Sequence, residues 1–368
     1  MTSKLLTPVQ VGDLALKNRI IMSSLTRSRA GKQHIPNELL AEYYMQRASA
    51  GLVMTEATMI AADGCAFTAE AGIWDAERVA GWKQVTDAVH QAGGLMAVQL
   101  WHPGRAAHSL LNDGAQPISS SNKAIRNDTI YTSKGAQPYE VPRALRTDEL
   151  PGIVASFRKA AENAKQAGFD AVEIHGAHGY LLDQFLRDGA NDRSDLYGGS
   201  IENRARLLFE VVDAAIDVLG AGRVGLRISP LVPYNDMIDS DPKLLVAYVA
   251  EQLERRGAAF LDLRHDQYDR PAEQELAKIA RTTYHGTLMR NGGFSQASGE
   301  AALADGSADA IIYGKLYIAN PDLVERFRLG TPLAQLDPKT LYSPGPHGYT
   351  DYPVFVGSRA EPAANAVI

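Results

Sequence analysis

Two histidines and a tyrosine form the clearest group of chemically active side chains in the sequence. His175, His178 and Tyr180 lie within the segment EIHGAHGYLLDQFL, directly after a short apolar run. Histidines at this spacing can bind a metal ion, transfer a proton or donate hydrogen bonds to a substrate, and they also occur as structural residues of loops. The side chains alone leave these roles open, so the elements that position them must be identified first.

Eight short apolar runs alternate along the chain with segments of helical periodicity. Most of the runs are nearly continuous in apolar residues, which is typical of strands buried on both faces of a parallel sheet. The predicted strands are 19–24, 51–56, 95–100, 170–175, 223–229, 259–264, 286–290 and 309–313. The clearest predicted helices are 76–92, 152–167, 200–219 and 243–256.

This alternation predicts a (β/α)8 barrel in a single domain, residues 1–355. A doubly wound sheet is disfavoured because eight strands are expected and the chain has no GxGxxG turn. Residues 5–18 are expected to form a β-hairpin that covers the bottom of the barrel, with its turn at Gly12-Asp13. Residues 102–147 form a long excursion after the third strand, and residues 356–368 are expected to be a disordered tail.

The composition indicates a soluble globular protein without nucleic-acid or membrane partners. The chain is 45% hydrophobic and 22% charged, and its net charge of -6 comes without a long basic run. No apolar stretch is long enough to cross a bilayer, and the first residues lack the apolar core of a signal peptide. Cys65 is the single cysteine, which excludes an intramolecular disulfide. We expect a cytoplasmic protein that is a monomer or a homodimer.

Barrel enzymes carry their active sites at the carboxyl ends of the strands, and hydrogen-bond donors predominate at those positions in this chain. Gln99 and Arg227 join the histidines and Tyr180 there, whereas Glu56 is the one clear carboxylate. A glycosidase needs a pair of carboxylates, and a metal-dependent hydrolase needs a third ligand that the two histidines lack. The set is better suited to a large, polar, organic cofactor. A charge on a central strand needs a partner, and we expect the cofactor to pair with Arg227.

Two glycine turns follow the last two predicted strands. The first is Asn291-Gly292-Gly293, and the second is Gly314 followed by Lys315. Barrels often bind a phosphate group at these positions through backbone N–H groups, and the ammonium group of a lysine adds positive charge. The turns therefore indicate that the cofactor carries a phosphate.

Longer motifs reveal a family resemblance. The segment HGAHGYLLDQFLRDGANDRSDLYGGSIENRARLLFEVVDA resembles the signature region of the old yellow enzyme family of flavin-dependent ene-reductases. The resemblance continues through NRIIMSSLTRSRA, QLWHPGRAAH, VGLRISP, MRNGGFS, YGKLYIANPDL and HGYTDYP, so it covers almost the whole chain in order. It implies a barrel enzyme that binds FMN non-covalently and takes hydride from NADPH or NADH.

The resemblance also implies roles for individual residues. Thr26 would hydrogen-bond the O4/N5 edge of the flavin, Gln99 its pyrimidine amide, and Arg227 the N1 side, where negative charge accumulates on reduction. The residues implied in cofactor binding are Ser24, Leu25, Thr26, Ala57, Gln99, Arg227, Asn291, Gly292, Gly293, Gly314 and Lys315. The residues implied in the wall of the substrate pocket are Phe67, Trp101 and Tyr349.

For the histidine pair, the resemblance implies hydrogen bonding to substrate. His175 and His178 would donate to the carbonyl or nitro oxygen of a small activated alkene, and Tyr180 would protonate its α carbon after hydride reaches the β carbon. Implied substrates are α,β-unsaturated carbonyls, maleimides and nitroalkenes. The alternatives are a flavin-binding isomerase, a nitroester reductase and a metal-dependent barrel hydrolase.

Three positions depart from the family pattern. Ser24 replaces a proline, Lys315 replaces an arginine next to the phosphate, and Phe67 replaces a tyrosine of the pocket wall. Lys315 keeps the charge but lacks the planar fork of a guanidinium, and Phe67 removes a hydroxyl group. We expect these changes to alter affinity or substrate preference and to leave the fold unchanged.

Overall fold

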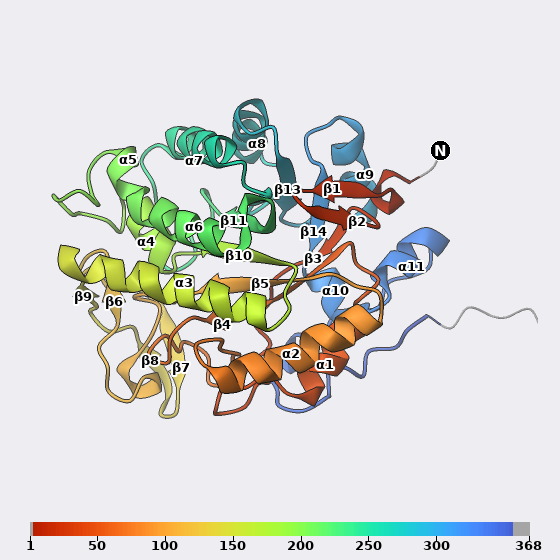
Figure 1. Ribbon diagram of the computed structural model, residues 1–368, viewed down its shortest axis with the longest axis horizontal. Coiled ribbons are helices and arrows are strands. Elements are labelled where there is room, and N and C mark those ends of the chain that lie inside the picture. The colour runs from red at the N-terminus through yellow and green to blue at the C-terminus, as the bar shows by residue number, and fades with distance from the viewer. Residues whose placement is uncertain (1–2, 356–368) are drawn as a thin grey trace, which may run out of the picture.

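Eight parallel strands close into a barrel in the computed structural model, which describes residues 3–355 (Figure 1). The strands are β3 (Ile20–Met22), β4 (Leu52–Met59), β5 (Met96–Trp101), β10 (Ala171–Gly176), β11 (Val224–Ile228), β12 (Phe260–Arg264), β13 (Thr287–Asn291) and β14 (Ala310–Tyr313). Around the barrel their order is β10-β11-β12-β13-β14-β3-β4-β5. The predicted (β/α)8 fold is confirmed, and each predicted strand overlaps one of the eight. The predicted tail, residues 356–368, lies outside the described residues.

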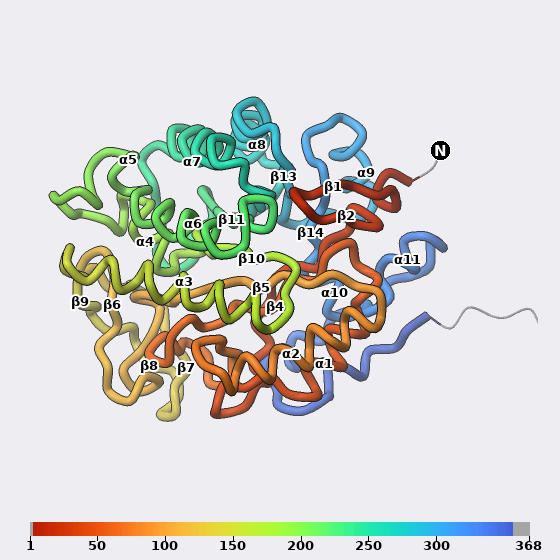
Figure 2. The backbone as a smooth tube through the Cα atoms, in the orientation of Figure 1, coloured from red at the N-terminus to blue at the C-terminus, as the bar shows by residue number. Residues whose placement is uncertain are grey.

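Helices cover the outside of the barrel (Figures 1 and 2). The α-helices are α1 (Glu38–Met45), α2 (Ala76–Gln91), α3 (Leu150–Gln166), α4 (Leu181–Leu186), α5 (Ile201–Arg204), α6 (Arg206–Leu219), α7 (Pro242–Arg256), α8 (Pro271–Thr283), α9 (Gln296–Ala304), α10 (Lys315–Ala319) and α11 (Leu323–Leu329). The 3₁₀ segments are η1 (Lys4–Leu6), η2 (Ser109–Leu111), η3 (Thr147–Glu149), η4 (Ala221–Arg223) and η5 (Pro338–Thr340). The prediction of one continuous helix over 200–219 is wrong: the chain breaks at Ala205, whose ψ of -7° is far from the helical value, and α5 and α6 are separate helices.

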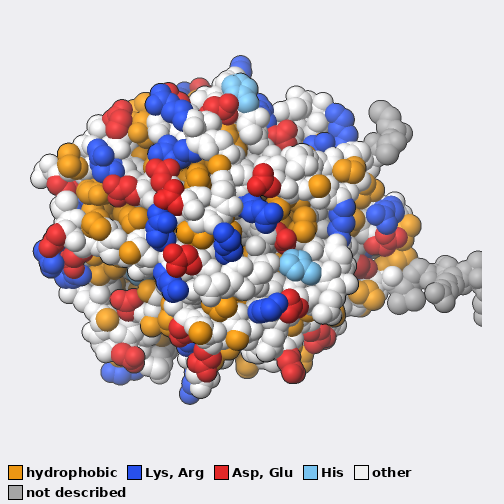
Figure 3. Space-filling view, in the orientation of Figure 1, with side chains coloured by type: hydrophobic (Ala, Val, Ile, Leu, Met, Phe, Trp, Pro, Cys, Tyr) orange, Lys and Arg blue, Asp and Glu red, His pale blue; other side chains and the backbone are white. Residues whose placement is uncertain are grey.

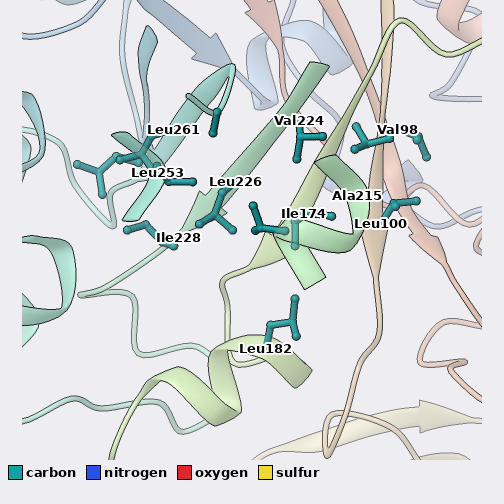
Figure 4. Close-up of a cluster of buried hydrophobic side chains, with 14 of the residues drawn as sticks. Val98, Leu100, Ile174, Leu182, Ala215, Val224, Leu226, Ile228, Leu253 and Leu261 are labelled. Atoms are coloured by element: carbon teal, nitrogen blue, oxygen red, sulfur yellow. The ribbon is translucent and has the colours of Figure 1, made fainter. Parts of the chain in front are cut away.

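Each barrel strand sends alternate side chains outward against the helices and inward into the barrel. On β11, Val224, Leu226 and Ile228 pack outward in the main core with Ala215 of α6 and Leu253 of α7 (Figure 4). A second apolar cluster fills the barrel near the amino ends of the strands. Its buried members are Val11, Leu14, Leu16, Ile21, Leu52, Met54, Ala97, Ala171, Ala259, Phe260, Met289, Ala310 and Ile312.

The predicted hairpin is present and closes the amino end of the barrel. It consists of β1 (Val9–Val11) and β2 (Leu14–Leu16), with the turn at Gly12 and Asp13. Gly12 has a φ of 53°, and a Cβ at this position would lie 2.2 Å from the carbonyl oxygen of Gly222. The apolar side chains of the hairpin belong to the inner cluster. Because this end is filled, a functional site must lie at the opposite, carboxyl end of the strands.

The long excursion after β5 carries short strands of its own. They are β6 (Ile118–Ser119), β7 (Thr129–Thr132), β8 (Gly135–Pro138) and β9 (Arg143–Ala144). The strands β7 and β8 form an antiparallel pair. The hydroxyl groups of Ser120 and Ser121 donate to the carbonyl oxygens of Gln184 and Ala190, both at 2.7 Å. These bonds hold the excursion against α4, directly after the segment that carries the histidines.

Within residues 3–355, no helix is long and apolar enough to cross a membrane. The face of the molecule in Figure 3 carries lysine and arginine side chains among aspartate and glutamate side chains, with scattered apolar groups between them. Basic side chains therefore do not gather into one patch on this face.

Candidate active site

The histidine pair lies at the carboxyl end of β10. His175 belongs to the strand and is buried, whereas His178 is on the following loop and has a positive φ of 55°. The centroids of the two imidazole rings are 5.6 Å apart. The backbone N–H of His178 donates to Ser229 Oγ, and Asn235 Nδ2 donates to the carbonyl oxygen of His178, both at 2.8 Å. These two bonds stabilise a backbone conformation that residues other than glycine rarely adopt.

Both imidazoles are neutral near pH 7. Burial is the main cause that lowers the pKa of His175 and of His178 well below the usual value. The charge of Arg227 lowers both values further, and that of Arg264 lowers the pKa of His178. A neutral imidazole has one N–H donor, and Nδ1 of His175 is buried with no hydrogen-bond partner in residues 3–355. The pair can therefore offer uncharged N–H donors to one substrate oxygen.

Tyr180 stands beside this pair. The centroid of its ring lies 5.3 Å from that of His175 and 5.1 Å from that of Trp101, whose plane it meets at 86°. Burial raises the pKa of Tyr180 well above its usual value near 10. The phenol therefore keeps its proton at neutral pH and is available as a proton donor.

A cavity of about 450 Å³ opens next to Tyr180. Its aromatic lining side chains are Phe67, Tyr131, Tyr139, Tyr180, Tyr234 and Tyr342. Trp101 and Tyr349, which the sequence also predicts in the pocket wall, are fully buried and do not line this cavity. Trp101 lies behind Tyr180, and Tyr349 stacks on Tyr43 with ring centroids 3.9 Å apart. The structure thus places Phe67 on the wall, Trp101 behind Tyr180, and Tyr349 against Tyr43, so the prediction that Trp101 and Tyr349 line the pocket is wrong for this cavity.

A second cavity, of about 470 Å³, lies at the carboxyl ends of the strands and reaches His178. Eight of the eleven residues predicted to bind the cofactor line it: Ser24, Leu25, Arg227, Asn291, Gly292, Gly293, Gly314 and Lys315. Thr26, Ala57 and Gln99 are outside its lining. Gln99 is directed into the barrel, where its amide donates a hydrogen bond to Glu173.

The turn after β13 suits a phosphate group because its backbone is uncovered. Gly292 has a φ of 129°, and a Cβ there would lie 2.4 Å from the carbonyl oxygen of His265. Gly293 has a φ of 88°, and a Cβ there would meet nothing within 4 Å. Glycine is required at both positions, and neither has a side chain to shield its N–H group. Lys315, the first residue of α10, adds an ammonium group to the same cavity.

Arg227 has protein partners that the sequence analysis missed. Its Nε lies 2.5 Å from Asp262 Oδ2 and 3.5 Å from Glu173 Oε2, and all three side chains are buried. Two carboxylic groups of neighbouring strands thus already contact the guanidinium, and its contact with the cofactor stays a prediction. The alternation of inward and outward side chains along β10 and β12 is the signal that could have placed both groups inside the barrel.

Glu173 keeps its proton near neutral pH. Burial raises the pKa of its carboxyl from 4.5 to about 8; the charge of Arg227 opposes this shift, and that of Asp262 adds to it. The polar layer inside the barrel therefore contains one guanidinium, one carboxylate and one carboxylic acid. Their mutual contacts hold the Arg227 guanidinium at the floor of the second cavity.

The two catalytic histidine candidates do not belong to a metal site. Across residues 3–355, the one group of His, Cys and acidic side chains close enough to hold an ion is His34, Cys65 and Glu70. His175 and His178 are not part of it, so the geometry offers no support for a metal-dependent hydrolase. The uncovered glycine turn and the cations beside it fit the phosphate of FMN instead.

Comparison with known proteins decides the family. The model of the NADH:flavin oxidoreductase / NADH oxidase family matches residues 4–334. The chain belongs to this family. A protein of Leishmania infantum described as a probable flavin mononucleotide-dependent alkene reductase is 44% identical over 95% of this chain and 97% of its own length. The 12-oxophytodienoate reductase 1 of Oryza sativa subsp. japonica is also 44% identical, over 95% of this chain and 92% of its own.

Solved structures of family members agree with this assignment. Morphinone reductase in complex with tetrahydroNAD is 43% identical and has a TM-score of 0.93, covering 98% of this chain and 100% of that one. The old yellow enzyme homologue from Zymomonas mobilis is 41% identical and has a TM-score of 0.92, covering 95% and 99%. The predicted old yellow enzyme family, FMN cofactor and oxidoreductase class are confirmed.

The three positions predicted to depart from the old yellow enzyme pattern have different surroundings. Ser24 lines the second cavity, and its Oγ lies 3.5 Å from Glu173 Oε2. Phe67 stacks on Tyr342 with ring centroids 5.9 Å apart. Lys315 shares its cavity with Arg264, a second cation that the sequence analysis did not single out.

Proposed function

We propose that this family member reduces the activated C=C bond of α,β-unsaturated carbonyls, maleimides and nitroalkenes, using FMN and either NADPH or NADH. The arrangement of His175, His178 and Tyr180 carries the proposal. His178 lines the glycine-rich cavity, Tyr180 lines the aromatic cavity, and His175 lies beside both residues. The relatives named as an alkene reductase and as a 12-oxophytodienoate reductase support this reaction class.

His175 and His178 would act as an uncharged pair of donors. The glycine turns and Lys315 would hold FMN, which when bound would supply the hydride that the reaction needs. The two N–H groups bind the carbonyl or nitro oxygen of the substrate and draw electron density away from the C=C bond. These hydrogen bonds strengthen as the oxygen gains negative charge, and such donors contribute about 2.7–4 kcal/mol each to transition-state stabilisation.

Tyr180 would supply the proton that completes the reduction. Its Oη gives a proton to the α carbon, while its ring packs edge-on against Trp101. Because burial raises the pKa of Tyr180, the phenol releases its proton only to a strongly basic centre. This delays protonation until charge has developed on the substrate.

The aromatic wall of the first cavity indicates the shape of the substrate. Phe67, Tyr131 and Tyr342 present ring faces and edges that pack well against flat π systems. We infer a preference for cyclic or aryl-substituted activated alkenes over short linear ones. The hydroxyl groups of Tyr139 and Tyr234 add polar positions on the same wall.

Visible absorption spectra, recorded before and after the addition of NADPH and then of cyclohexenone, test the proposal. The purified protein is expected to show a flavin band that bleaches with anaerobic NADPH and returns when cyclohexenone is added. The double variant His175→Ala/His178→Ala removes both N–H donors; it should retain FMN but reduce cyclohexenone at least about 100-fold more slowly, since each donor is worth about 10²-fold or more. His285→Ala, on the exposed surface, is the matched control and should turn over at the wild-type rate. Unchanged turnover in the double variant would contradict the role of the pair.

A cytoplasmic location, a monomeric or homodimeric state and the absence of nucleic-acid and membrane partners stay predictions from composition. Light scattering after size-exclusion chromatography checks the oligomeric state.

A further inference from the structure

Three cations line the glycine-lined cavity, and two of them, Arg264 and Lys315, have no carboxylate partner, unlike Arg227. Arg264 is the last residue of β12, and its Cα partner on β13 is Asn291, the residue directly before the Gly292-Gly293 turn. Lys315 reaches the same cavity from the start of α10. A guanidinium and an ammonium group therefore share the space into which the uncovered backbone of the turn opens.

Neither cation has a protein partner in residues 3–355. No carboxylate of these residues lies within ion-pair distance of Arg264 or Lys315, and Nη1 of Arg264 is buried without a hydrogen-bond partner. Two buried arginines near this end of the barrel have protein partners, although Nε of Arg187 has none in residues 3–355. Arg227 pairs with Asp262, and the guanidinium of Arg187 donates to backbone carbonyl oxygens. The side chain of Arg264 is partly buried, and a charge withdrawn from water without a partner is costly, so its environment points to an external anion.

The one acidic side chain in the lining of this cavity does not cancel the two charges. Asp266 lines the cavity, but its Oδ2 lies 2.6 Å from Nη1 of Arg270 in an ion pair. The cavity therefore keeps two uncompensated positive charges next to the glycine turn. A phosphate monoester carries about 1.5 to 2 negative charges near pH 7, which matches two cations better than one.

We propose that Arg264 is a second cationic ligand of the terminal phosphate of FMN, acting together with Lys315. This inference rests on the proposed function, since it concerns the cofactor of that site. A guanidinium can bind two phosphate oxygens at once, whereas the ammonium group of Lys315 acts as a point charge. Arg264 thereby restores the bidentate contact that lysine cannot make at position 315.

The pyrophosphate of a nicotinamide dinucleotide has the same chemistry and is the competing source of the anion. Arg264 and Lys315 also line a wider cavity of about 940 Å³ together with Tyr234 and Asp236. A contact with the dinucleotide from that side would change the KM for NADPH and leave FMN affinity unaltered. Substitution of Arg264 therefore distinguishes the two sources of the anion: loss of a contact with FMN changes FMN affinity, and loss of a contact with the dinucleotide changes the KM for NADPH.

Flavin titration of the full-length apoprotein tests the assignment. The dissociation constants of FMN and of riboflavin, which lacks the phosphate, are measured by flavin fluorescence for the wild type and for Arg264→Gln. We expect Arg264→Gln to weaken FMN binding about 10- to 100-fold, the range for a lost charge-assisted hydrogen bond, and to change riboflavin binding less than about twofold. The dissociation constant of FMN for Arg264→Lys should fall between those of the wild type and Arg264→Gln. Arg255→Gln, which removes an exposed guanidinium on α7, should bind both flavins as the wild type does.

Three outcomes would overturn the inference. Arg264→Gln could weaken FMN and riboflavin equally, leave both unchanged, or raise only the KM for NADPH. If Arg264→Gln does not fold, Arg264→Lys provides the same comparison, and an FMN-to-riboflavin affinity ratio equal to that of the wild type counts against the assignment. Failure of the wild type to bind either flavin would refute the proposed function instead.

Discussion

The buried trio of Glu173, Arg227 and Asp262 allows a quantitative prediction about stability. At pH 7, Glu173 is protonated because its pKa is about 8, so Glu173→Gln exchanges one neutral group for another of the same shape. We expect the free energy of unfolding to change by less than about 1 kcal/mol. Asp262→Asn removes the carboxylate that lies 2.5 Å from Arg227, but Glu173 can then ionise and pair with the guanidinium in its place.

The magnitudes follow from the cost of moving that proton. Ionising a carboxyl with a pKa of about 8 at pH 7 costs about 1 kcal/mol, and the cost is smaller in Asp262→Asn because the Asp262 charge that helps to raise this pKa is gone; the variant should therefore destabilise the protein by at most about 1–2 kcal/mol. In the double variant Glu173→Gln/Asp262→Asn, Arg227 is left buried without a carboxylate. Breaking a buried pair in this way costs about 3–5 kcal/mol. The double variant should therefore lose at least about 1 kcal/mol more than the two single variants together.

Guanidinium chloride unfolding of the apoprotein at pH 7, followed by tryptophan fluorescence, measures this coupling. The exposed pair of Arg256 and Asp213, whose atoms are 2.6 Å apart, supplies the control. Asp213→Asn should cost less than about 1 kcal/mol because solvent screens that pair. Additive effects of Glu173→Gln and Asp262→Asn, within about 0.5 kcal/mol, would show that Glu173 does not take over from Asp262 and would refute the reasoning.

Other measurements test the pKa shifts, the proton donor and the glycine turn. Burial raises the pKa of Glu173 to about 8 and that of Glu56 to about 7, so at these two groups the folded state binds more protons than the unfolded state between about pH 4.5 and 8. The lowered pKa values of His175 and His178 act in the opposite direction below about pH 6.5. In thermal melts, the stability of the wild type relative to Glu56→Gln, in which the histidine contribution cancels, should fall as pH rises from about 4.5 to 7; a constant difference would contradict the shift. Tyr180→Phe should leave flavin reduction by NADPH intact and slow reoxidation by cyclohexenone about 10²-fold or more in stopped-flow traces, whereas equal slowing of both steps would exclude a proton donor. Gly292→Ala should weaken FMN binding more than Gly293→Ala, since only the first Cβ meets backbone, at 2.4 Å; equal losses would contradict the steric argument.

Much of the fold is determined by local features of the sequence. Apolar runs that alternate with helical periodicity predicted the eight strands, and the turn at Gly12 and Asp13 predicted the hairpin that closes the barrel. These signals are local because strand and helix periodicity depend on which residues stand two, three or four positions apart. Periodicity did not predict the helix break at Ala205, because the same apolar pattern runs through both α5 and α6.

The chemistry of the site was also readable in outline, since the types of residue limit what a site can do. His175, His178 and Tyr180 lie within six residues of one another, and their proximity needed no long-range contact. The glycines after the last two strands could be predicted to share one site because the barrel topology brings those two strand ends together, and their binding of a phosphate stays a prediction. The sequence by itself therefore determined which hydrogen-bond donors the site can contain and which strands and loops carry them.

The tertiary structure decided which charges are paired and which aromatic rings reach a cavity. Arg227 meets Glu173 and Asp262 across three neighbouring strands, whereas Arg264, two residues after Asp262, meets no carboxylate in the described part of the chain. Tyr349 stacks on Tyr43, some three hundred positions earlier in the sequence, and is thereby removed from the pocket wall. Such contacts depend on strand register and on the packing of distant segments. Residue type and spacing along the chain do not determine strand register or the packing of distant segments. The charge pairs and the buried position of Tyr349 could therefore be identified only in the folded barrel.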